Sequence, residues 1–252
     1  MKNKFILLIS IILFSFKNSS AQELPPIQVD RPDQTECPFI VPAKHFQIEN
    51  GMNFEQVNKN ESNIFHPSTL WKYGVNEKFE LRLITELTTQ KIYDERIFGL
   101  TAIKVGFKTK LMEEKGVFPL TSFLGHLTIP KLASKEFSNT FFAPSFRFTM
   151  QHTLTKDISL SYNLGAEMNG VTAEPIFIYT LTTGFSLSEK FGTYVELYGF
   201  APQNNISEHR ADGGITYYVH PNILVDLSGG VGLTENAPQF YIATGFSLRK
   251  PN

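Results

Sequence analysis

Apolar and polar residues alternate along most of this chain in runs of about a dozen residues, the period expected of a β-strand with two different faces. In the clearest run, Leu160, Tyr162 and Leu164 share one face and Ser161 and Asn163 lie on the other. Such runs predict strands over residues 45–58, 63–76, 78–91, 99–112, 116–130, 141–155, 158–170, 175–188, 191–203, 208–220, 222–235 and 239–250. The pattern therefore predicts an all-β chain.

Two features of these strands favour a transmembrane barrel over a secreted sandwich or a soluble barrel. The runs are about twice as long as the usual soluble strand, which suits a tilted membrane strand. The polar face is rich in Gly, Ser, Thr and Asn, as expected of a confined interior, whereas a soluble exterior carries mostly Lys and Glu. We therefore predict an antiparallel up-and-down transmembrane β-barrel of about twelve strands, with the apolar face toward lipid.

The connections between the predicted strands alternate in length. Tight turns are expected around residues 76–77, 155–157, 188–190 and 220–222, and looser connections at 92–98, 131–140 and 201–207. Short turns on the periplasmic side and longer loops outside are typical of porin-like barrels, whose even strand number returns both termini to one side. The strand over 116–130 fits least well, because Phe118, Leu120 and Leu124 fall on its polar face.

The first 21 residues have the features of a signal peptide. Lys2 and Lys4 precede an apolar run from Phe5 to Phe16, which is too short to span a bilayer comfortably. The small residues 19–21 suit cleavage after Ala21. We expect a signal peptide over 1–21, a Pro-rich segment over 22–44, a barrel over 45–252 and export to the outer membrane of a Gram-negative bacterium.

Composition narrows the classes of function. The 252-residue chain has a formal net charge of -1, which argues against a nucleic-acid binder. Its single cysteine, Cys37, has no partner for an internal disulfide, and we interpret it as incidental. Because the common hydrolase, metal and redox motifs are absent from the sequence, no cofactor, metal site or catalytic residue is predicted. His126 and His152, with Ser122 and Ser145 near them in sequence, do not by themselves indicate an enzyme.

Charged residues of both signs fall on the face predicted to point inward. These lumen-lining candidates are Glu49, Glu55, Lys72, Glu80, Arg82, Glu86, Lys104, Lys108, Arg147, Glu167, Glu196 and Asp226. Their balance favours a mutually neutralised wall of cross-strand pairs over a strong preference for ions of one sign.

The segment over 22–44 differs from the rest of the chain. Its five prolines exclude a helix or a central strand, and it contains the polar motif Asp30-Arg31-Pro32-Asp33-Gln34-Thr35-Glu36. Such a segment either extends into the periplasm as a flexible tether or folds into the barrel mouth. In the second case Asp30, Arg31, Asp33, Gln34 and Glu36 are the candidate residues of a plug, held by Lys104, Lys108 and Arg147.

The run DRPDQTECPFIVPAKHFQIENGMNFEQ, at residues 30–56, resembles the start of an outer-membrane family known as transporters of the meta-pathway of phenol degradation. In that family a DRPDxTE-like motif leads into a first strand similar to HFQIENG. The likeness covers most of residues 28–250, and it is most specific at this motif. The resemblance implies an outer-membrane barrel that moves small, aromatic or hydrophobic organic compounds.

We therefore expect a monomeric barrel that acts as a narrow channel or transporter for small organic solutes. The alternatives are a closed structural or ligand-binding barrel without transport and, third, a barrel-embedded lipid-modifying enzyme. The expected partners are membrane lipids, the barrel-assembly machinery and an unidentified small-molecule substrate. The substrate, the direction of transport and the openness of the lumen do not follow from the sequence.

Overall fold

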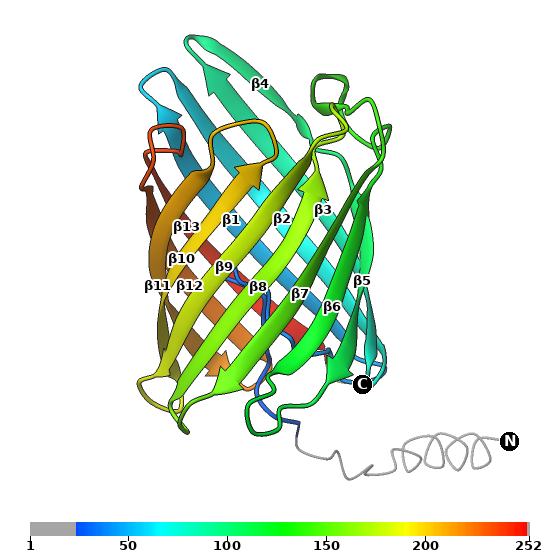
Figure 1. Cartoon of the computed structure of the whole chain (residues 1–252), viewed down its shortest axis with the longest axis vertical. Helices are drawn as coiled ribbons and strands as arrows, with labels where there is room; N and C mark the ends of the chain where they lie inside the picture. Colours follow the sequence, from blue (N-terminus) through cyan, green and yellow to red (C-terminus); the bar gives the residue numbers. More distant parts are fainter. Residues whose placement is uncertain (1–23, 251–252) are drawn as a thin grey trace, which may run out of the picture.

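The computed structural model describes residues 24–250 as one closed sheet of antiparallel strands (Figure 1). The strands are β1 (Phe46–Asn58), β2 (Glu61–Asn76), β3 (Phe79–Ile92), β4 (Glu95–Leu100), β5 (Lys104–Met112), β6 (Leu120–Thr128), β7 (Ala143–Thr153), β8 (Ile158–Met168), β9 (Pro175–Ser186), β10 (Phe191–Pro202), β11 (Glu208–His220), β12 (Ile223–Gly232) and β13 (Phe240–Lys250). One short 3-10 helix, η1 (Lys135–Phe137), lies between β6 and β7. No helix among residues 24–250 is long and apolar enough to span a membrane.

The sheet closes because β1 pairs with both β2 and β13. β3 pairs with β5 along its first half and with β4 along its second, so β4 and β5 share one position in the wall. The thirteen strands therefore fill twelve positions, which confirms the predicted antiparallel up-and-down barrel. The proposed signal peptide, residues 1–21, lies outside the described residues.

The predicted strands differ from the observed ones mainly between β3 and β6. A single strand over 99–112 was wrong, because the wall is interrupted at residues 101–103. There the Thr101 amide still donates to the Glu86 carbonyl of β3 at 2.9 Å, whereas the Ile103 amide donates to Leu132, in the loop before β7, at 3.3 Å. The looser connection expected at 92–98 was also wrong, since β3 and β4 form a hairpin with a turn at residues 93–94.

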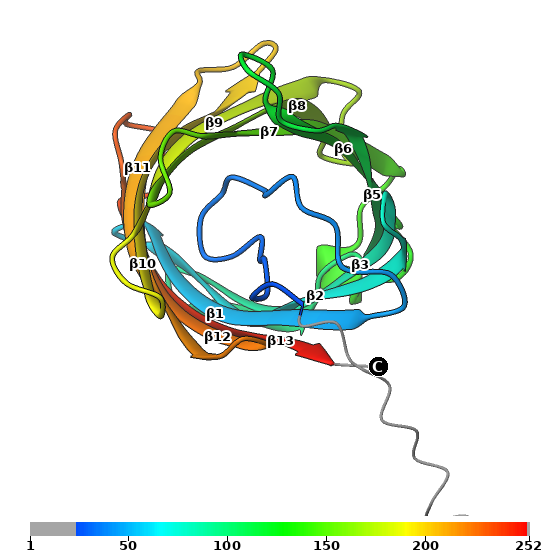
Figure 2. The same ribbon diagram turned by 90° about the horizontal axis from the view of Figure 1, so that it is seen from below.

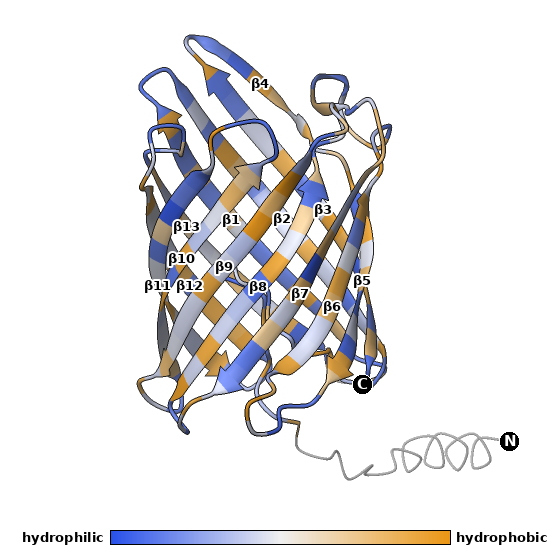
Figure 3. Ribbon diagram, in the orientation of Figure 1, coloured by the Kyte–Doolittle hydropathy of each residue, from blue (hydrophilic) through white to orange (hydrophobic). Residues whose placement is uncertain are grey.

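The two faces of the wall have opposite character. In Figure 3 hydrophobic and hydrophilic residues alternate along the strands. Large apolar side chains are exposed outward on nearly every strand, for example Leu81, Phe107, Phe148, Leu164, Leu181, Leu197, Leu227 and Ile242. Polar side chains are buried inside, among them Gln47, Glu49, Lys72, Glu80, Lys108, Thr149, Asn163, Thr180, Glu196, Asp226 and Ser247. An apolar exterior around a polar interior is the arrangement of a membrane barrel, in which lipid covers the outer face.

β6 explains the irregular sequence pattern over 116–130. Phe118 precedes the strand, whereas Leu120 and Leu124 are buried on the inner face. The inward residue between them, Ser122, donates a hydrogen bond to the Pro38 carbonyl at 2.6 Å. Apolar side chains are therefore tolerated inside this part of the wall because residues from before β1 cover it.

The segment that precedes β1 fills the middle of the barrel. Seen along the barrel axis in Figure 2, residues 24–45 form an irregular loop inside the ring of strands. The chain enters from the end where the C-terminus also lies, and this end carries the connections 77–78, 154–157, 187–190 and 221–222. We call it the turn end. The opposite, loop end carries the longer connections 129–142, 169–174 and 233–239.

Candidate functional site

The candidate site is the barrel interior, where the segment over 22–44 (the N-terminal segment) meets the wall. From residue 25 onward this segment hydrogen-bonds to strands around the whole circumference. Its partners are Glu49 on β1, Lys72 on β2, Glu80 and Arg82 on β3, Lys108 on β5, Ser122 on β6, Arg147 on β7, Asn163 on β8, Thr180 on β9, Glu196 on β10, Tyr218 on β11, Asp226 on β12 and Arg249 on β13. The wall therefore determines the path of a segment that has no regular structure of its own.

Asp30 is the centre of the strongest contact. One carboxylate oxygen accepts from Lys72 Nζ at 2.8 Å and Arg82 Nη1 at 3.0 Å, and the other accepts from Lys108 Nζ at 2.8 Å. The three cations come from three different strands and are almost completely buried. Buried charges persist only where they are paired and hydrogen-bonded, so this cluster requires the Asp30 carboxylate.

Wall carboxylates complete the charge balance around Asp30. Glu49 accepts from the backbone amides of Asp30 at 2.8 Å and Arg31 at 3.2 Å, and it also pairs with Lys72 at 2.5 Å. Glu80 pairs with Arg82 at 3.1 Å and accepts from the Val41 amide at 2.8 Å. These two residues therefore hold the backbone of the segment as well as the cations. We call Asp30 and the five wall residues Glu49, Lys72, Glu80, Arg82 and Lys108 the anchor cluster.

The rest of the motif is bound mainly through hydrogen bonds to the opposite wall, and Glu36 also pairs with Arg82 at 2.8 Å. The Gln34 amide donates to Glu196 at 2.7 Å, and the Thr35 hydroxyl donates to the same carboxylate at 2.5 Å. Asn163 binds both backbone groups of Glu36, accepting from its amide at 2.8 Å and donating to its carbonyl at 3.0 Å. The polar residues of β8 and β10 thus replace the hydrogen bonds that an irregular backbone otherwise lacks.

Arg31 occupies a slot made by two glycines. Gly51 and Gly245 face each other across β1 and β13, and a Cβ at either position would lie within about 2.5 Å of the Arg31 guanidinium. From this slot Arg31 pairs with Asp226 at 2.9 Å. The absence of side chains at these two positions is therefore a requirement of the site, since any larger residue displaces Arg31.

The surroundings of the two aspartates of the motif have opposite effects on their acidity. Burial opposes ionisation of Asp30, but Lys108, Lys72 and Arg82 outweigh it, so the pKa of Asp30 lies well below its ordinary value. Burial, Glu196 and Asp212 all raise the pKa of Asp33 well above its ordinary value. Burial also raises the pKa of the Cys37 thiol, which argues against a reactive thiolate.

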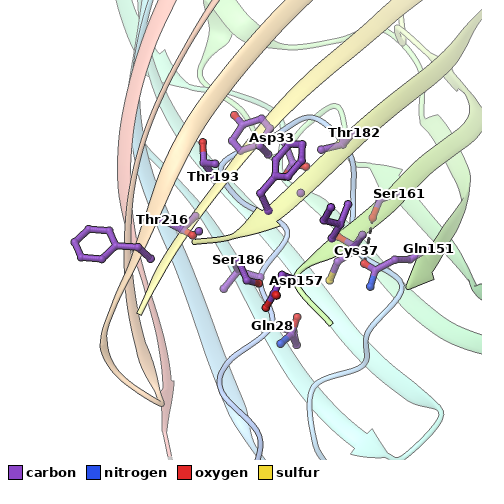
Figure 4. Close-up of a pocket in the computed structure, with 18 of the residues that line it drawn as sticks. Gln28, Asp33, Cys37, Gln151, Asp157, Ser161, Thr182, Ser186, Thr193 and Thr216 are labelled. Carbon is purple, nitrogen blue, oxygen red and sulfur yellow. Dashed lines mark hydrogen bonds between the residues drawn. The ribbon is translucent and has the colours of Figure 1, made fainter. Parts of the chain in front are cut away.

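The N-terminal segment divides the interior into cavities. A cavity of about 590 Å³ opens toward the turn end between the segment and β7–β11, and Figure 4 shows residues that line it, including Asp33, Cys37, Gln151 and Thr182. A second cavity of about 270 Å³ is lined by Glu55, Tyr198, Arg210 and other wall residues. Arg31, Pro32 and Asp33 line both cavities, so these three residues form the partition between them.

The structure divides the lumen-lining candidates into three groups. Glu49, Lys72, Glu80, Arg82, Lys108, Arg147, Glu196 and Asp226 bond to the N-terminal segment. Glu86, Lys104 and Glu167 line a separate cavity of about 310 Å³ together with residues of the loop-end connections. Glu55 pairs with Arg210 at 3.0 Å. The candidates therefore do not form one ring, and many of their ion pairs join the wall to the segment instead of one strand to the next.

Of the plug candidates, Asp30, Arg31, Gln34 and Glu36 bond directly to the wall, and Asp33 lines both cavities. Lys108 and Arg147 contact the segment as expected, whereas Lys104 does not, because it lies in the cavity near the loop end. Sequence reasoning missed Lys72 and Arg82 as partners of Asp30. Their inward position was predicted, but pairing with a segment of no fixed register was not.

The histidines and serines considered as catalytic residues are not hydrogen-bonded to one another among residues 24–250. Ser122 donates to the Pro38 carbonyl, which leaves its hydroxyl proton engaged by the N-terminal segment. His152 lies 6.0 Å from the ring of Tyr162, with the two rings stacked. Ser145 and His126 are register partners across β6 and β7, yet neither makes a hydrogen bond to the other among the described residues.

A family model described as "Putative MetA-pathway of phenol degradation" matches residues 29–249. In structure, the chain is similar to an outer membrane channel from Pseudomonas putida F1, with a TM-score of 0.69 and 9% identity over 88% of this chain and 100% of that one. It is also similar to the NanC porin, with a TM-score of 0.55 and 10% identity over 81% and 98%. The KdgM porin gives a TM-score of 0.52 and 9% identity over 80% and 98%. No curated protein matches the sequence. At such identities the structural likeness establishes the fold alone, which is that of outer-membrane channels.

Proposed function

Because the chain belongs to the family described as "Putative MetA-pathway of phenol degradation", and because its fold is that of outer-membrane channels, we propose that it is a narrow channel for small organic solutes. The single observation that carries the proposal is the pair of cavities of about 590 and 270 Å³ inside the barrel, which share Arg31, Pro32 and Asp33 in their linings. Displacement of this short partition joins the two cavities inside the barrel. The N-terminal segment is then the constriction of the channel.

The lining of the larger cavity supports an uncharged solute that carries hydroxyl groups and an aromatic ring. Hydroxyl side chains dominate its strand-borne lining, with Ser161, Thr182 and Thr216 among them. Tyr194, which is buried on the inner face of β10, adds flat apolar surface. Polar groups placed beside an aromatic surface are typical of small-molecule sites, and the phenol in the family's description fits this chemistry.

We place the barrel in the outer membrane of a Gram-negative bacterium, with residues 1–21 removed on export. The apolar outer face then contacts lipid, and the turn end faces the periplasm because short turns lie on that side in bacterial barrels. Membrane lipids and the barrel-assembly machinery are the expected partners of a monomer. No catalytic role is proposed, since the hydroxyl of Ser122 is bound to the segment.

The alternative is a closed barrel that binds a ligand without transport, and one observation favours it. The anchor cluster holds the N-terminal segment through buried ion pairs, which cost several kcal/mol to break when one partner is left behind. A segment bound so tightly keeps the partition in place. The two functions differ in flux, because only a channel passes solute across a membrane.

Liposome swelling separates the two. Vesicles carrying the folded barrel are placed in phenyl glucoside or phenyl glucuronide, two solutes of similar size that differ by one carboxylate. We expect phenyl glucoside to enter faster than in protein-free vesicles, and phenyl glucuronide to enter more slowly than phenyl glucoside. If neither solute enters faster than in protein-free vesicles, the channel is wrong and the closed barrel is favoured. Equal entry of both keeps the channel but contradicts the preference for uncharged solutes.

A further inference from the structure

The charges inside the barrel are distributed unevenly around the N-terminal segment. On the side of β1 to β5, Asp30 and the wall carboxylates of the anchor cluster neutralise all three buried cations. On the side of β10 and β11, Asp33, Glu196 and Asp212 form no ion pair with any cation among residues 24–250. The segment is therefore held by opposite charges on one side and faces like charges on the other.

The three carboxyls meet where the segment crosses β10 and β11. Glu196 and Asp212 are direct register partners on these two strands. The amide of Gln34, the residue after Asp33, donates to Glu196 at 2.7 Å. Asp33 and Asp212 line the same cavity of about 270 Å³. The Asp33 carboxyl thus shares a cavity with Asp212, and the residue that follows it is held by Glu196.

The nearby cations are already engaged. Arg31 pairs with Asp226 at 2.9 Å, and Arg210 pairs with Glu55 at 3.0 Å and Glu208 at 2.7 Å. The titratable and charged groups that face Asp33 are Asp30 and Arg31 of the segment, Glu55 of β1, Tyr194, Glu196 and Tyr198 of β10, Arg210 and Asp212 of β11, Asp226 of β12 and Tyr241 of β13. None of them supplies a free positive charge to Asp33.

Unused hydrogen-bonding capacity marks the same place. Tyr194 is only 6% exposed, and its hydroxyl has no hydrogen-bond partner among the described residues. One oxygen of Asp212 accepts from the Tyr241 hydroxyl at 2.5 Å, whereas the other is buried without a partner. Glu196 differs, because its carboxylate is fully occupied by Gln34, Thr35 and Thr182. The pair that lacks compensation is therefore Asp33 and Asp212.

We propose that Asp33 and Asp212 form a pH-sensitive latch, which holds the N-terminal segment across the lumen while a proton is bound and releases it when both carboxyls are ionised. The proposal rests on the proposed function, because it describes how the constriction of that channel opens. Two like charges at one site cannot both ionise without a cost, and release of the segment separates them.

The direction of the pH effect follows from the pKa of Asp33, which burial, Glu196 and Asp212 raise in the docked segment. A group whose pKa is raised on docking favours docking below its ordinary pKa, and this contribution is lost as pH rises through the raised value. Asp30 has the opposite sign, because its pKa is lowered on docking, so its contribution is lost only as pH falls through the lowered value. Docking is therefore strongest at intermediate pH, and rising pH acts through Asp33.

Cys37 provides a native reporter, because it is the only cysteine and lies on the segment beside Lys108. The folded barrel is treated with a maleimide attached to a polymer too bulky to enter the cavity of about 590 Å³, so labelling requires release of the segment. The labelling rate of the parent chain is divided by the labelling rate of Asp33→Asn at the same pH, which cancels the pH dependence of the Cys37 thiol itself. Asp212→Asn is a second test variant, and Asp94→Asn, in the exposed turn between β3 and β4, is the control.

We expect the ratio of the two labelling rates to rise about tenfold between about pH 6 and about pH 8. The loss of one proton from a carboxyl whose pKa is raised on docking weakens docking by up to about tenfold per pH unit. The same rise should be smaller in Asp212→Asn, in which burial and Glu196 still act on Asp33, and it should be unchanged in Asp94→Asn. A constant ratio, or a rise as large in Asp212→Asn as in the parent chain, overturns the latch. Labelling of Cys37 does not depend on passage of solute through the barrel, so the two proposals can fail separately. A pH-dependent labelling ratio in a barrel without solute flux refutes the channel alone. Solute flux with a constant labelling ratio refutes the latch alone.

Discussion

At the scale of single residues, the interior is organised by the pairing of buried charges and backbone amides with side chains of the wall and the N-terminal segment. Asp30 satisfies three buried cations from three strands, and Glu49 and Glu80 satisfy backbone amides as well as cations. Arg31 needs the empty space over Gly51 and Gly245 to reach Asp226. A residue with no side chain is therefore as necessary to the site as a charged one.

The first prediction concerns this glycine slot. Gly51→Ala should push the flexible Arg31 guanidinium away from Asp226, because the new Cβ would overlap it, while the β1 backbone keeps its pairing. The lost charged hydrogen bonds weaken docking by about 1–3 kcal/mol, so Cys37 should react with the bulky maleimide about tenfold faster.

Gly184→Ala is the matched control, since its Cβ would approach only the end of the Ser159 side chain. Both variants should fold and retain heat-resistant migration on gels. Equal labelling rates in the two variants would show that Arg31 does not need the slot.

At the scale of strands, sequence and structure agree where apolar residues face outward and polar residues face inward along the whole strand. β8, for example, was predicted over 158–170 and runs over Ile158–Met168, because its outward and inward residues differ at every step. Agreement fails where this alternation is broken. The strand ladder stops at residues 101–103, where Ile103 bonds to Leu132 in the loop before β7, and the leucines of β6 face inward beneath the N-terminal segment.

The contacts of the N-terminal segment are the part of the site that the sequence does not predict. Its prolines excluded regular structure and its charges indicated a plug, but an irregular segment has no period from which to assign partners. Its contacts are defined by the closed barrel, in which strands far apart in sequence converge on one carboxylate. Asp30 and Lys108, for instance, are 78 residues apart.

The second prediction tests the two faces of one strand. Leu164→Arg places a charge on the outer face, where Leu164 is 56% exposed to lipid, and should reduce the free energy of folding into bilayers by about 2–4 kcal/mol. Ser161→Arg, on the inner face beside the cavity of about 590 Å³, should cost less because the new side chain reaches water and polar groups. Folding equilibria in urea, measured with lipid vesicles, compare them. A cost for Ser161→Arg as large as that for Leu164→Arg would contradict the assignment of the faces.

At the scale of the whole molecule, a barrel of twelve wall positions encloses more space than its own side chains fill, and the N-terminal segment occupies the difference. The segment is fastened on the β1 to β5 side by the anchor cluster and lies against uncompensated carboxyls on the β10 and β11 side. This asymmetry suits a constriction whose release begins on the β10 and β11 side. The central claim is that this segment, and not the barrel wall, limits passage.

Planar-bilayer conductance of a variant that lacks residues 28–37 tests this claim most directly. The deletion removes the partition residues Arg31, Pro32 and Asp33 together with Asp30, and it leaves every strand of the wall intact. Heat-resistant migration on gels should be unchanged, which shows that the barrel still folds. The account predicts a larger single-channel conductance for the deletion variant than for the parent chain. A variant that folds normally and conducts no better than the parent would contradict it.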